Sequence, residues 1–248
     1  SLTAQADYAF PLYGLPGDLA KTREGAILGQ IIEGGYQPYP TRREIEAGFH
    51  LAEKGLELVW LNDPIDAYIA HVNGSAVVEL ADGSQYRLGY AGKNGRDYTS
   101  LGRELVADGL LHKDQVSLAG IRTWASMNPD LVSEYLNRND SYVFFTQIDG
   151  NPRGSLNVEV SPQRTLATDK TLFPRGALVY VDATLPLPST AGRRGHTPFR
   201  QLMLDQDTGG AIRTAGRADI YLGVGPQAEQ RAGATRSEGQ LYYLFLEE

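Results

Sequence analysis

The sequence predicts a mainly β protein with a few helices, and three observations lead to that class. Tyr, Val and Thr recur in short apolar runs separated by Gly- and Pro-rich turns, which is typical of strands. One block, residues 100–138, has helical periodicity instead. From residue 142 onward the apolar runs again have strand character. The change near residues 140–150 is therefore the best candidate for a domain boundary.

The first 90 residues are predicted to form strands around one helix. Thr41 and Glu44 have the spacing of a capping box, which predicts a helix that closes at Lys54-Gly55. Asp82-Gly83 is a strong signal for a hairpin turn. Strands are expected at 9–13, 26–32, 56–61, 67–72, 76–80 and 85–90.

Three short helices are expected within residues 100–138. The third of them begins at Asn128-Pro129, because Asn is a favoured N-cap and Pro fits the first helical position. Residues 186–198 are predicted to form a mobile surface loop. Later strands are expected at 142–147, 154–160, 177–182, 200–205, 219–223 and 240–246, with a short helix near 226–232.

Composition excludes several classes of function. A net charge of -7 argues against nucleic acid as the main partner, because phosphate binding requires a basic face. The absence of cysteine excludes disulfides and thiolate chemistry. No apolar stretch approaches the roughly 20 residues of a membrane span. The chain starts at Ser1 without an initiator Met or a signal peptide, so we expect a processed or truncated piece.

Metal, serine-hydrolase and nucleotide chemistry find no support in the motifs. The four histidines lack metal-ligand spacing, and no Ser/His/Asp arrangement is legible. The chain also lacks the GxxxxGK[ST] loop that cradles phosphate. We therefore expect neither a metal nor a cofactor.

Three aspartates stand where strand-like runs meet loops. Asp207 and Asp219 bracket a turn at Gly209-Gly210, and Asp169 lies upstream in the same setting. Carboxylates gathered in one site can hold a proton near neutral pH, which cleavage of a glycosidic bond requires. Equally, most carboxylates are solvated, Asp219 can bond its own turn, and paired glycines often form only a turn.

A second constellation lies in residues 90–102, YAGKNGRDYTSLG. One interpretation is a hairpin end followed by a helix cap. The other is a sugar-binding rim, in which Tyr90 or Tyr98 stacks on a pyranose face while Lys93 and Asn94 hydrogen-bond to hydroxyls. The residues alone do not separate these two interpretations.

Several separated motifs, taken in order, resemble the membrane-bound lytic murein transglycosylase A family. They are YAGKNGRDYTSLG (90–102), NRNDSYVFF (137–145), Thr168-Asp169 with FPRG (173–176), DQDTGGAI (205–212) and ADIYLGVGPQAEQRAG (218–233). The resemblance implies two domains. Residues 148–248 would be the three-aspartate region of a double-psi β-barrel. Residues 1–147 would be a smaller β-barrel-like domain with the helical block, forming one wall of a saccharide groove.

The resemblance also implies an activity and a place in the cell. It implies cleavage of the β-1,4 bond between N-acetylmuramic acid and N-acetylglucosamine, on the periplasmic side of the outer membrane. Asp219 would be the single acid/base, buried in part beneath the bound sugar, with Asp207 as its catalytic companion and Asp169 in support. Membrane anchorage, and half of the large barrel, would come from a segment ahead of Ser1.

The groove wall would include Asn73-Gly74-Ser75 beside the 90–100 segment. The family pattern Gln-Gly-Ser-Gly reads Asn-Gly-Ser-Ala at these positions, which predicts a different reach for this wall. Peptidoglycan strands are the expected partner, with cell-wall synthesis proteins as further partners. The main alternative is a non-catalytic, expansin-like module that binds polysaccharide or loosens the wall, and a scaffold for wall-synthesis proteins is a third reading.

Overall fold

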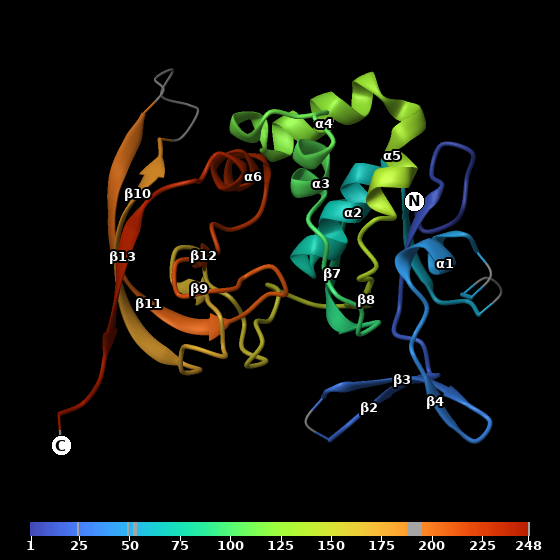
Figure 1. The fold of residues 1–248 in the computed structure, drawn as a ribbon, viewed down its shortest axis with the longest axis horizontal. Helices are drawn as coiled ribbons and strands as arrows, with labels where there is room; N and C mark the ends of the chain where they lie inside the picture. The colour runs from blue at the N-terminus through green and yellow to red at the C-terminus, as the bar shows by residue number, and fades with distance from the viewer. Residues whose placement is uncertain (24, 49, 52–53, 188–194, 248) are drawn as a thin grey trace. The chain divides into compact units, whose positions relative to one another are not determined.

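The structure is a computed structural model that describes residues 1–248 except 24, 49, 52–53, 188–194 and 248. The described residues form helices α1–α6 and strands β1–β13, so the prediction of a mainly β protein is confirmed. The chain divides into two compact units, Ser1–Gly150 and Asn151–Glu248 (Figure 1). The sheets of the described residues do not close into a barrel, and the double-psi topology therefore stays a prediction.

Two small antiparallel sheets meet at the centre of the first unit. A single β-bridge joins the two sheets. It pairs Gly14, the residue after β1, with Phe145 of β8. Leu12, Val59, Leu88 and Phe145 are all buried there, which makes the junction part of the unit's core. One sheet is β1 (Phe10–Tyr13) with β5 (Glu57–Leu61); the other is β6 (Ala76–Glu79), β7 (Gln85–Lys93) and β8 (Val143–Gln147).

A third sheet of the first unit consists of β2 (Leu19–Lys21), β3 (Ile27–Ile32) and β4 (Gly35–Gln37), which pair in sequence order (Figure 1). The predicted hairpin between β6 and β7 is confirmed. The Asp82 carboxylate accepts the Ser84 N–H at 2.9 Å, and Gly83 has φ 80°. That left-handed conformation is why the turn favours glycine.

Residues 67–72 lie in helix α2 (Pro64–Asn73), so the predicted strand there is wrong. The Asp63 carboxylate accepts the Ile65 N–H at 2.7 Å, and proline occupies the first helical position. Gly74 ends the helix in the left-handed conformation. The N-cap Asp63, the proline that follows it and Gly74 predict the helix better than the apolar run predicts a strand, because so short a run suits either element.

Helix α1 (Arg42–Glu46) begins with the predicted capping box. The Glu44 carboxylate accepts the Thr41 N–H at 2.7 Å, and the Thr41 hydroxyl accepts the Glu44 N–H at 3.4 Å. The helix ends at Glu46, well before the predicted end at Lys54-Gly55. Two of the apolar residues on which that length rested, 49 and 52, lie outside the described residues.

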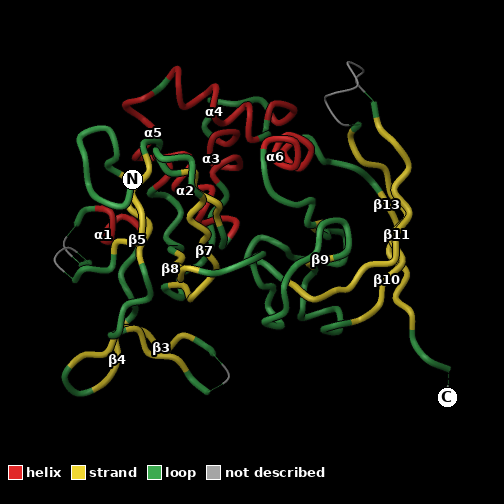
Figure 2. The backbone as a smooth tube through the Cα atoms, turned by 180° about the vertical axis from the view of Figure 1, so that it is seen from behind, coloured by secondary structure: helices red, strands yellow, loops and turns green. Residues whose placement is uncertain are grey.

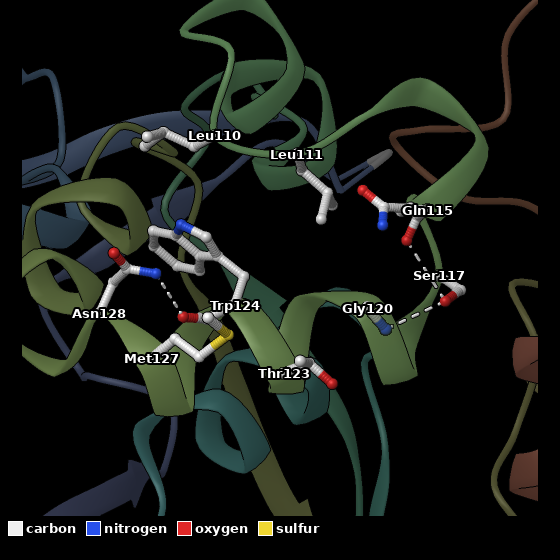
Figure 3. Close-up of a pocket in the computed structure, with 9 residues that line it drawn as sticks. All are labelled: Leu110, Leu111, Gln115, Ser117, Gly120, Thr123, Trp124, Met127 and Asn128. Atoms are coloured by element: carbon white, nitrogen blue, oxygen red, sulfur yellow. Dashed lines mark hydrogen bonds between the residues drawn. The ribbon is translucent and has the colours of Figure 1, made fainter.

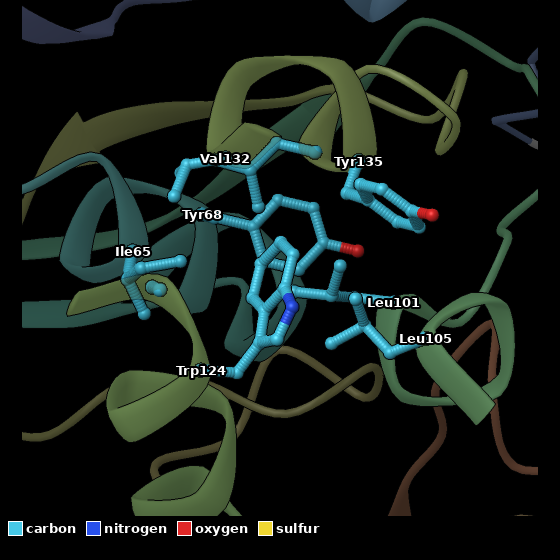
Figure 4. Packing of buried hydrophobic residues seen from close by; sticks show 9 residues of the cluster. Ile65, Tyr68, Leu101, Leu105, Trp124, Val132 and Tyr135 are labelled. Atoms are coloured by element: carbon cyan, nitrogen blue, oxygen red, sulfur yellow. The ribbon is translucent and has the colours of Figure 1, made fainter. Parts of the chain in front are cut away.

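The helical block packs with α2 around one apolar core (Figure 4). Trp124 and Tyr135 meet edge to face at its centre, with ring centroids 5.3 Å apart. Asn128 precedes α5 as predicted, but its side chain makes no cap bond; its amide donates to the Trp124 carbonyl at 2.8 Å instead. The helices of the block are α3 (Leu101–Ala107), α4 (Leu118–Met127) and α5 (Pro129–Leu136), with a 3-10 turn at Lys113–Gln115.

The second unit contains one five-stranded sheet in the order β12-β9-β11-β10-β13 (Figures 1 and 2). β9 runs parallel to β11, and the other neighbours are antiparallel. The strands are β9 (Thr165–Ala167), β10 (Ala177–Pro186), β11 (His196–Asp207), β12 (Asp219–Ile220) and β13 (Gly239–Leu244), and the predicted helix is α6 (Pro226–Gly233).

Two predictions for the second unit need correction. Residues 154–160 are not a strand; they contribute only a bridge between Arg153 and Glu159. The predicted loop at 186–198 is shorter, because Pro186 and His196 form the last pair of the β10–β11 hairpin. Residues 188–194 of that loop lie outside the described residues.

Both faces of this sheet are apolar. Val179, Val181 and Met203 are buried on one face. On the other, Leu178 pairs with both Leu204 and Leu244, and all three are exposed. These three leucines form a small exposed apolar patch on that face.

Arg42 connects α1 to the segment that leads into β8. Its Nε donates to the Asn139 carbonyl at 3.2 Å and its Nη2 to the Ser141 carbonyl at 2.9 Å. The guanidinium carbon lies 5.0 Å from the Tyr68 ring centroid and 4.9 Å from that of Tyr142. The side chain is only 1% exposed, so these bonds form in a site that excludes water.

We expect Arg42→Met to lower the free energy of unfolding by about 2–4 kcal/mol, because it leaves the Asn139 and Ser141 carbonyls without this donor and Glu46 without its ion pair. Chemical denaturation followed by far-UV circular dichroism measures the change. The matched control is Arg43→Met, since Arg43 is exposed on the same helix. Equal stability of the two variants would contradict the role given to Arg42.

Candidate active site

Strand β9 places two of the three predicted aspartates on one face of the sheet. Its last residue, Ala167, pairs with Asp207 of β11 on one side and with Asp219 of β12 on the other. Paired residues point to the same face, and neighbouring strands lie about 4.8 Å apart, so the two aspartate Cα atoms are about 10 Å apart. The pairing thus brings the two carboxylates to one end of one strand.

A β-bulge in β11 decides which aspartate joins this face. The register shifts between Asp205 and Asp207: Asp205 pairs with the core residue Leu166, and Asp207 pairs with Ala167. In a regular strand residues two apart share a face, and the bulge breaks that rule. Asp205 is consequently turned to the core, whereas Asp207 lies on the face of Asp219.

Asp207 is half-buried beneath the segment of Gly154 and Ser155. The Ser155 N–H donates to the Asp207 carboxylate at 2.9 Å. A Cβ on Gly154 would lie 2.8 Å from the Gln206 carbonyl oxygen, so the close approach of this segment requires glycine. Burial raises the pKa of Asp207, although the N–H groups of Thr208 and Ser155 oppose the shift.

Asp219 forms an ion pair with Arg217. Arg217 Nε donates to Asp219 Oδ1 and Nη2 to Oδ2, both at 3.0 Å. The Asp219 side chain is 47% exposed, and its further burial beneath a bound sugar stays a prediction. The guanidinium also donates to the Ala211 carbonyl at 2.8 Å, which ties the pair to the loop between the two aspartates.

The carboxylate of Asp169 forms hydrogen bonds that hold the loop between Asp207 and Asp219. Its carboxylate accepts the Thr171 hydroxyl at 2.7 Å and the Thr171 N–H at 3.0 Å, which lower the pKa of Asp169. It also accepts the Thr214 N–H at 3.0 Å. Thr214 has φ 76°, a strained value for a β-branched residue that the bond helps to hold. Gly209-Gly210 begins the same loop, where the Ile212 N–H donates to the Gly209 carbonyl at 3.0 Å.

A buried ion pair that the sequence analysis missed supports the site from the core side. Lys170 bonds Asp205, and their side chains are 5% and 0% exposed. The Asp205 carboxylate also accepts the hydroxyls of Thr168 and Tyr243, each at 2.7 Å. Burial and this carboxylate raise the pKa of Tyr243. The sequence contained one signal for this pair: Asp205 is a charged residue inside the apolar run of β11. A buried charge requires a partner.

Asn94, in the first unit, has a structural role. Its amide nitrogen donates to the Pro40 and Asp140 carbonyls, both at 2.8 Å. Its amide oxygen accepts the N–H groups of Tyr142 and Arg96. All four hydrogen-bonding positions of the amide are occupied and the side chain is buried, so it is not available to bind sugar hydroxyls. For Asn94, which directly follows β7, the interpretation of this segment as a hairpin end holds.

The other candidates of the first unit lie near the end of α2 and along or after β7. Gly74, flanked by Asn73 and Ser75, faces the ring of Tyr90: a Cβ on Gly74 would lie 3.6 Å from Tyr90 Cδ2. Tyr90 itself is 52% exposed and can still offer its ring to a ligand. Lys93 ends β7, and Tyr98 lies in the segment that leads to α3. Their binding roles stay predictions.

Comparison with known proteins agrees with both units. Residues 1–146 match the model of the MltA specific insert domain, and residues 164–245 match that of the 3D domain. Membrane-bound lytic murein transglycosylase A of Vibrio cholerae is 32% identical over 97% of this chain and 60% of its own length. The Escherichia coli K12 protein of that name is 32% identical over 98% of this chain and 61% of its own length.

Solved structures are similar across almost the whole chain. A membrane-bound lytic murein transglycosylase from Agrobacterium tumefaciens superposes with a TM-score of 0.86 and 31% identity, covering 98% of this chain and 69% of that one. E. coli MltA with bound chitohexaose gives a TM-score of 0.76 at 29% identity, covering 98% and 68%.

The matches define a protein with an MltA specific insert domain followed by a 3D domain. The chain belongs to the membrane-bound lytic murein transglycosylase A family. It spans about three fifths of the length of the curated relatives that it matches. Within the described ranges, none of the helices has the length and apolar character needed to cross a membrane.

We expect Lys170→Met to lower the free energy of unfolding by about 3–5 kcal/mol, because the Asp205 charge would stay buried without its counter-ion. Urea denaturation measures the difference. Lys113→Met is the control, since Lys113 is exposed. A loss no larger than that of the control would argue against a buried pair.

The two perturbed aspartates should affect stability with opposite dependence on pH. The raised pKa of Asp207 means that this group favours the folded state at acid pH, and that the gain is lost as the pH rises through its pKa. Asp207→Asn should therefore not destabilise the fold at pH 7. The lowered pKa of Asp169 contributes stability above the unfolded-state pKa, so Asp169→Asn should destabilise at pH 7, and less so as the pH falls.

Melting temperatures of the two variants between pH 2.5 and pH 7 provide the measurement. Parallel curves for Asp169→Asn and Asp207→Asn would contradict the two assigned environments.

Proposed function

We propose that this protein is a peptidoglycan lytic transglycosylase with its reacting carboxyls in the second unit. The observation that carries the proposal is the pairing of Asp207 and Asp219 with the two sides of Ala167. It gathers two carboxylates on one face, at an end of the sheet where a polymer could approach Asp219. Family membership and the chitohexaose complex of the E. coli relative support a glycan as the substrate class.

The proposed chemistry uses Asp219 as the only acid/base. Protonated Asp219 donates to the oxygen that links N-acetylmuramic acid to N-acetylglucosamine. The resulting carboxylate then accepts the proton of the muramoyl C6 hydroxyl, whose oxygen bonds to C1 and forms the 1,6-anhydro ring. Because the nucleophile belongs to the substrate, no second carboxylate and no bound water has to attack.

Arg217 adds a requirement to this mechanism. Both oxygens of the Asp219 carboxylate are held by the Arg217 guanidinium, so this pair has to separate before the carboxyl can act on a substrate. We infer that the bound glycan separates the pair, excludes water from the half-exposed carboxyl and accepts hydrogen bonds from the guanidinium. Asp207 would assist as the second acidic side chain on the same face.

The groove wall, the location and the partners follow from the same proposal. Tyr90, beside Gly74, is the candidate of the first unit best placed to stack on a sugar ring, because half of its side chain is exposed. The relatives are named membrane-bound, which supports a place in the bacterial cell envelope. Peptidoglycan strands are the proposed partner.

Asp219→Asn should reduce the release of 1,6-anhydromuropeptides by a factor of about 10²–10⁴, the usual contribution of a general acid or base. Mass spectrometry of digested peptidoglycan measures these products. Asp182→Asn is the matched control, because Asp182 is also ion-paired with an arginine and 40% exposed in the same sheet. Normal turnover by the Asp219 variant would remove it from the acid/base role.

Asp207→Asn should lower the rate and shift the pH optimum, because it removes a half-buried carboxyl with a raised pKa from the face that also carries Asp219. The measurement is kcat/KM for anhydro-product release between pH 4 and pH 9. An unchanged profile would exclude electrostatic coupling. Complete inactivation of this variant, with an active Asp219→Asn, would instead make Asp207 the acid.

The same assay tests the alternative of a non-catalytic, expansin-like module. Such a module would bind peptidoglycan in a pull-down and leave no anhydro ends. Reducing-end sugars as the sole product would identify a hydrolase and overturn the transglycosylase proposal.

A further inference from the structure

A hollow of about 440 Å³ lies beside α4 in the first unit (Figure 3). The described side chains that line it are uncharged, and the indole nitrogen of Trp124 is turned to Leu101 and Leu105 of the core (Figure 4). This lining therefore defines no ligand. In the second unit, by contrast, the buried side chain of Gln206 contacts β9, the strand that pairs with both aspartates of the candidate active site.

Gln206 is the extra residue of the β-bulge in β11. Asp205 pairs with Leu166 of β9, and Asp207 pairs with Ala167, so β11 advances by two residues where β9 advances by one. Gln206, which lies between them, is not paired in the described register. A bulge disrupts the ladder of main-chain hydrogen bonds, so the extra residue needs another anchor.

The side-chain amide of Gln206 supplies that anchor. Its nitrogen donates to the Glu159 carbonyl at 3.1 Å and to the Thr165 hydroxyl oxygen at 3.0 Å. A carbonyl oxygen can only accept, which fixes the nitrogen on this side of the amide. Gln206 is only 6% exposed, so little water competes for these two bonds.

The anchor also fixes the face of the sheet. Thr165 and Ala167 are two residues apart in β9 and therefore share a face. The Gln206 amide bonds Thr165 on that face, and Asp207 pairs with Ala167 on the same face. In a regular strand, Gln206 and Asp207 would point to opposite faces. Their common face is thus a consequence of the bulge.

The competing arrangement is the regular register of β11. Gln206 would then pair with Ala167, and Asp207 would point to the opposite face, away from Asp219, because a slip of one residue moves side chains to the other face. The regular register would restore the ladder, but it would separate the Gln206 amide from its two acceptors. Because a buried donor without an acceptor is unfavourable, the amide favours the bulge.

We propose that Gln206 is a positioning residue of the candidate active site. It holds the extra residue of the bulge against β9, and it thereby keeps Asp207 beneath Ser155 and on the face of Asp219. Gln206 transfers no proton and contacts no substrate. Its effect on the reaction rests on the proposed function, whereas its effect on the register does not.

Amide hydrogen exchange measures the register without a substrate. The Ser155 N–H donates to the Asp207 carboxylate at 2.9 Å, and the Thr168 N–H donates to the Asp207 main-chain carbonyl at 3.3 Å. Gln206→Leu keeps an extended side chain but removes the donors. It should speed the exchange of both amides about tenfold or more and leave the amides of β10 unchanged. Gln240→Leu is the matched control, because Gln240 is exposed in β13 of the same sheet.

Gln206→Glu provides a rescue that depends on pH. A protonated carboxyl can donate one hydrogen bond to the Glu159 carbonyl, whereas a carboxylate can only accept. Burial against that acceptor should raise the pKa of the introduced carboxyl. The protection factor of the Thr168 amide should therefore be high at acid pH and fall as the pH rises through this pKa. Its acceptor, a main-chain carbonyl, does not titrate. Gln206→Leu should show no recovery at acid pH.

Activity tests the consequence for the reaction. Gln206→Leu should lower kcat for anhydro-product release about tenfold or more with little change in KM, because it displaces Asp207 and removes no contact to the sugar. An unchanged kcat with a lost register would overturn the effect on catalysis.

Three results would overturn the positioning role itself: unchanged protection of Ser155 and Thr168 in Gln206→Leu, equally faster exchange throughout the sheet, or no recovery of Gln206→Glu at acid pH. If Gln206→Leu does not fold, the pH series of Gln206→Glu decides. An unaltered protein that releases no anhydro products would contradict the proposed function, and the exchange data would still support the role of Gln206 in the register.

Discussion

The pairing of the short strand β9 on both of its edges is the constraint on which the candidate active site depends. Ala167 forms the rung that carries Asp207 on one side and Asp219 on the other, and the bulge in β11 turns Asp207 onto that face. Two like charges gain nothing by approaching each other. Main-chain hydrogen bonds and the burial of Thr165, Leu166 and Ala167 hold them there.

Each acidic side chain near β9 is stabilised in a different way. Asp205 has a buried lysine, Asp169 has a hydroxyl and N–H donors, and Asp219 has an arginine. Asp207 is held by the Ser155 N–H in a half-buried position, and its pKa is the one raised among the perturbed aspartates of this site. The acidic side chains of this region therefore differ in burial and in partners, and burial raises the pKa of Asp207.

Local signals predicted much of the secondary structure, because caps and turns depend on a few neighbouring residues. The capping box at Thr41, the turn at Asp82-Gly83 and the helix that starts at Pro129 were all read from short patterns. The strand predicted at 67–72 failed, because an apolar run of that length suits either element and the Asp63-Pro64 start was overlooked.

The sequence by itself determined the class of fold, the family resemblance and the three aspartates, because these reside in residue types and their order. Only the tertiary structure decided how those residues are used. It placed Asp207 under Ser155, exposed Asp219 beside Arg217, paired Lys170 with Asp205 and enclosed Asn94 among main-chain groups. Burial and pairing arise from segments distant in the chain, and no local pattern reports which side chains will meet there.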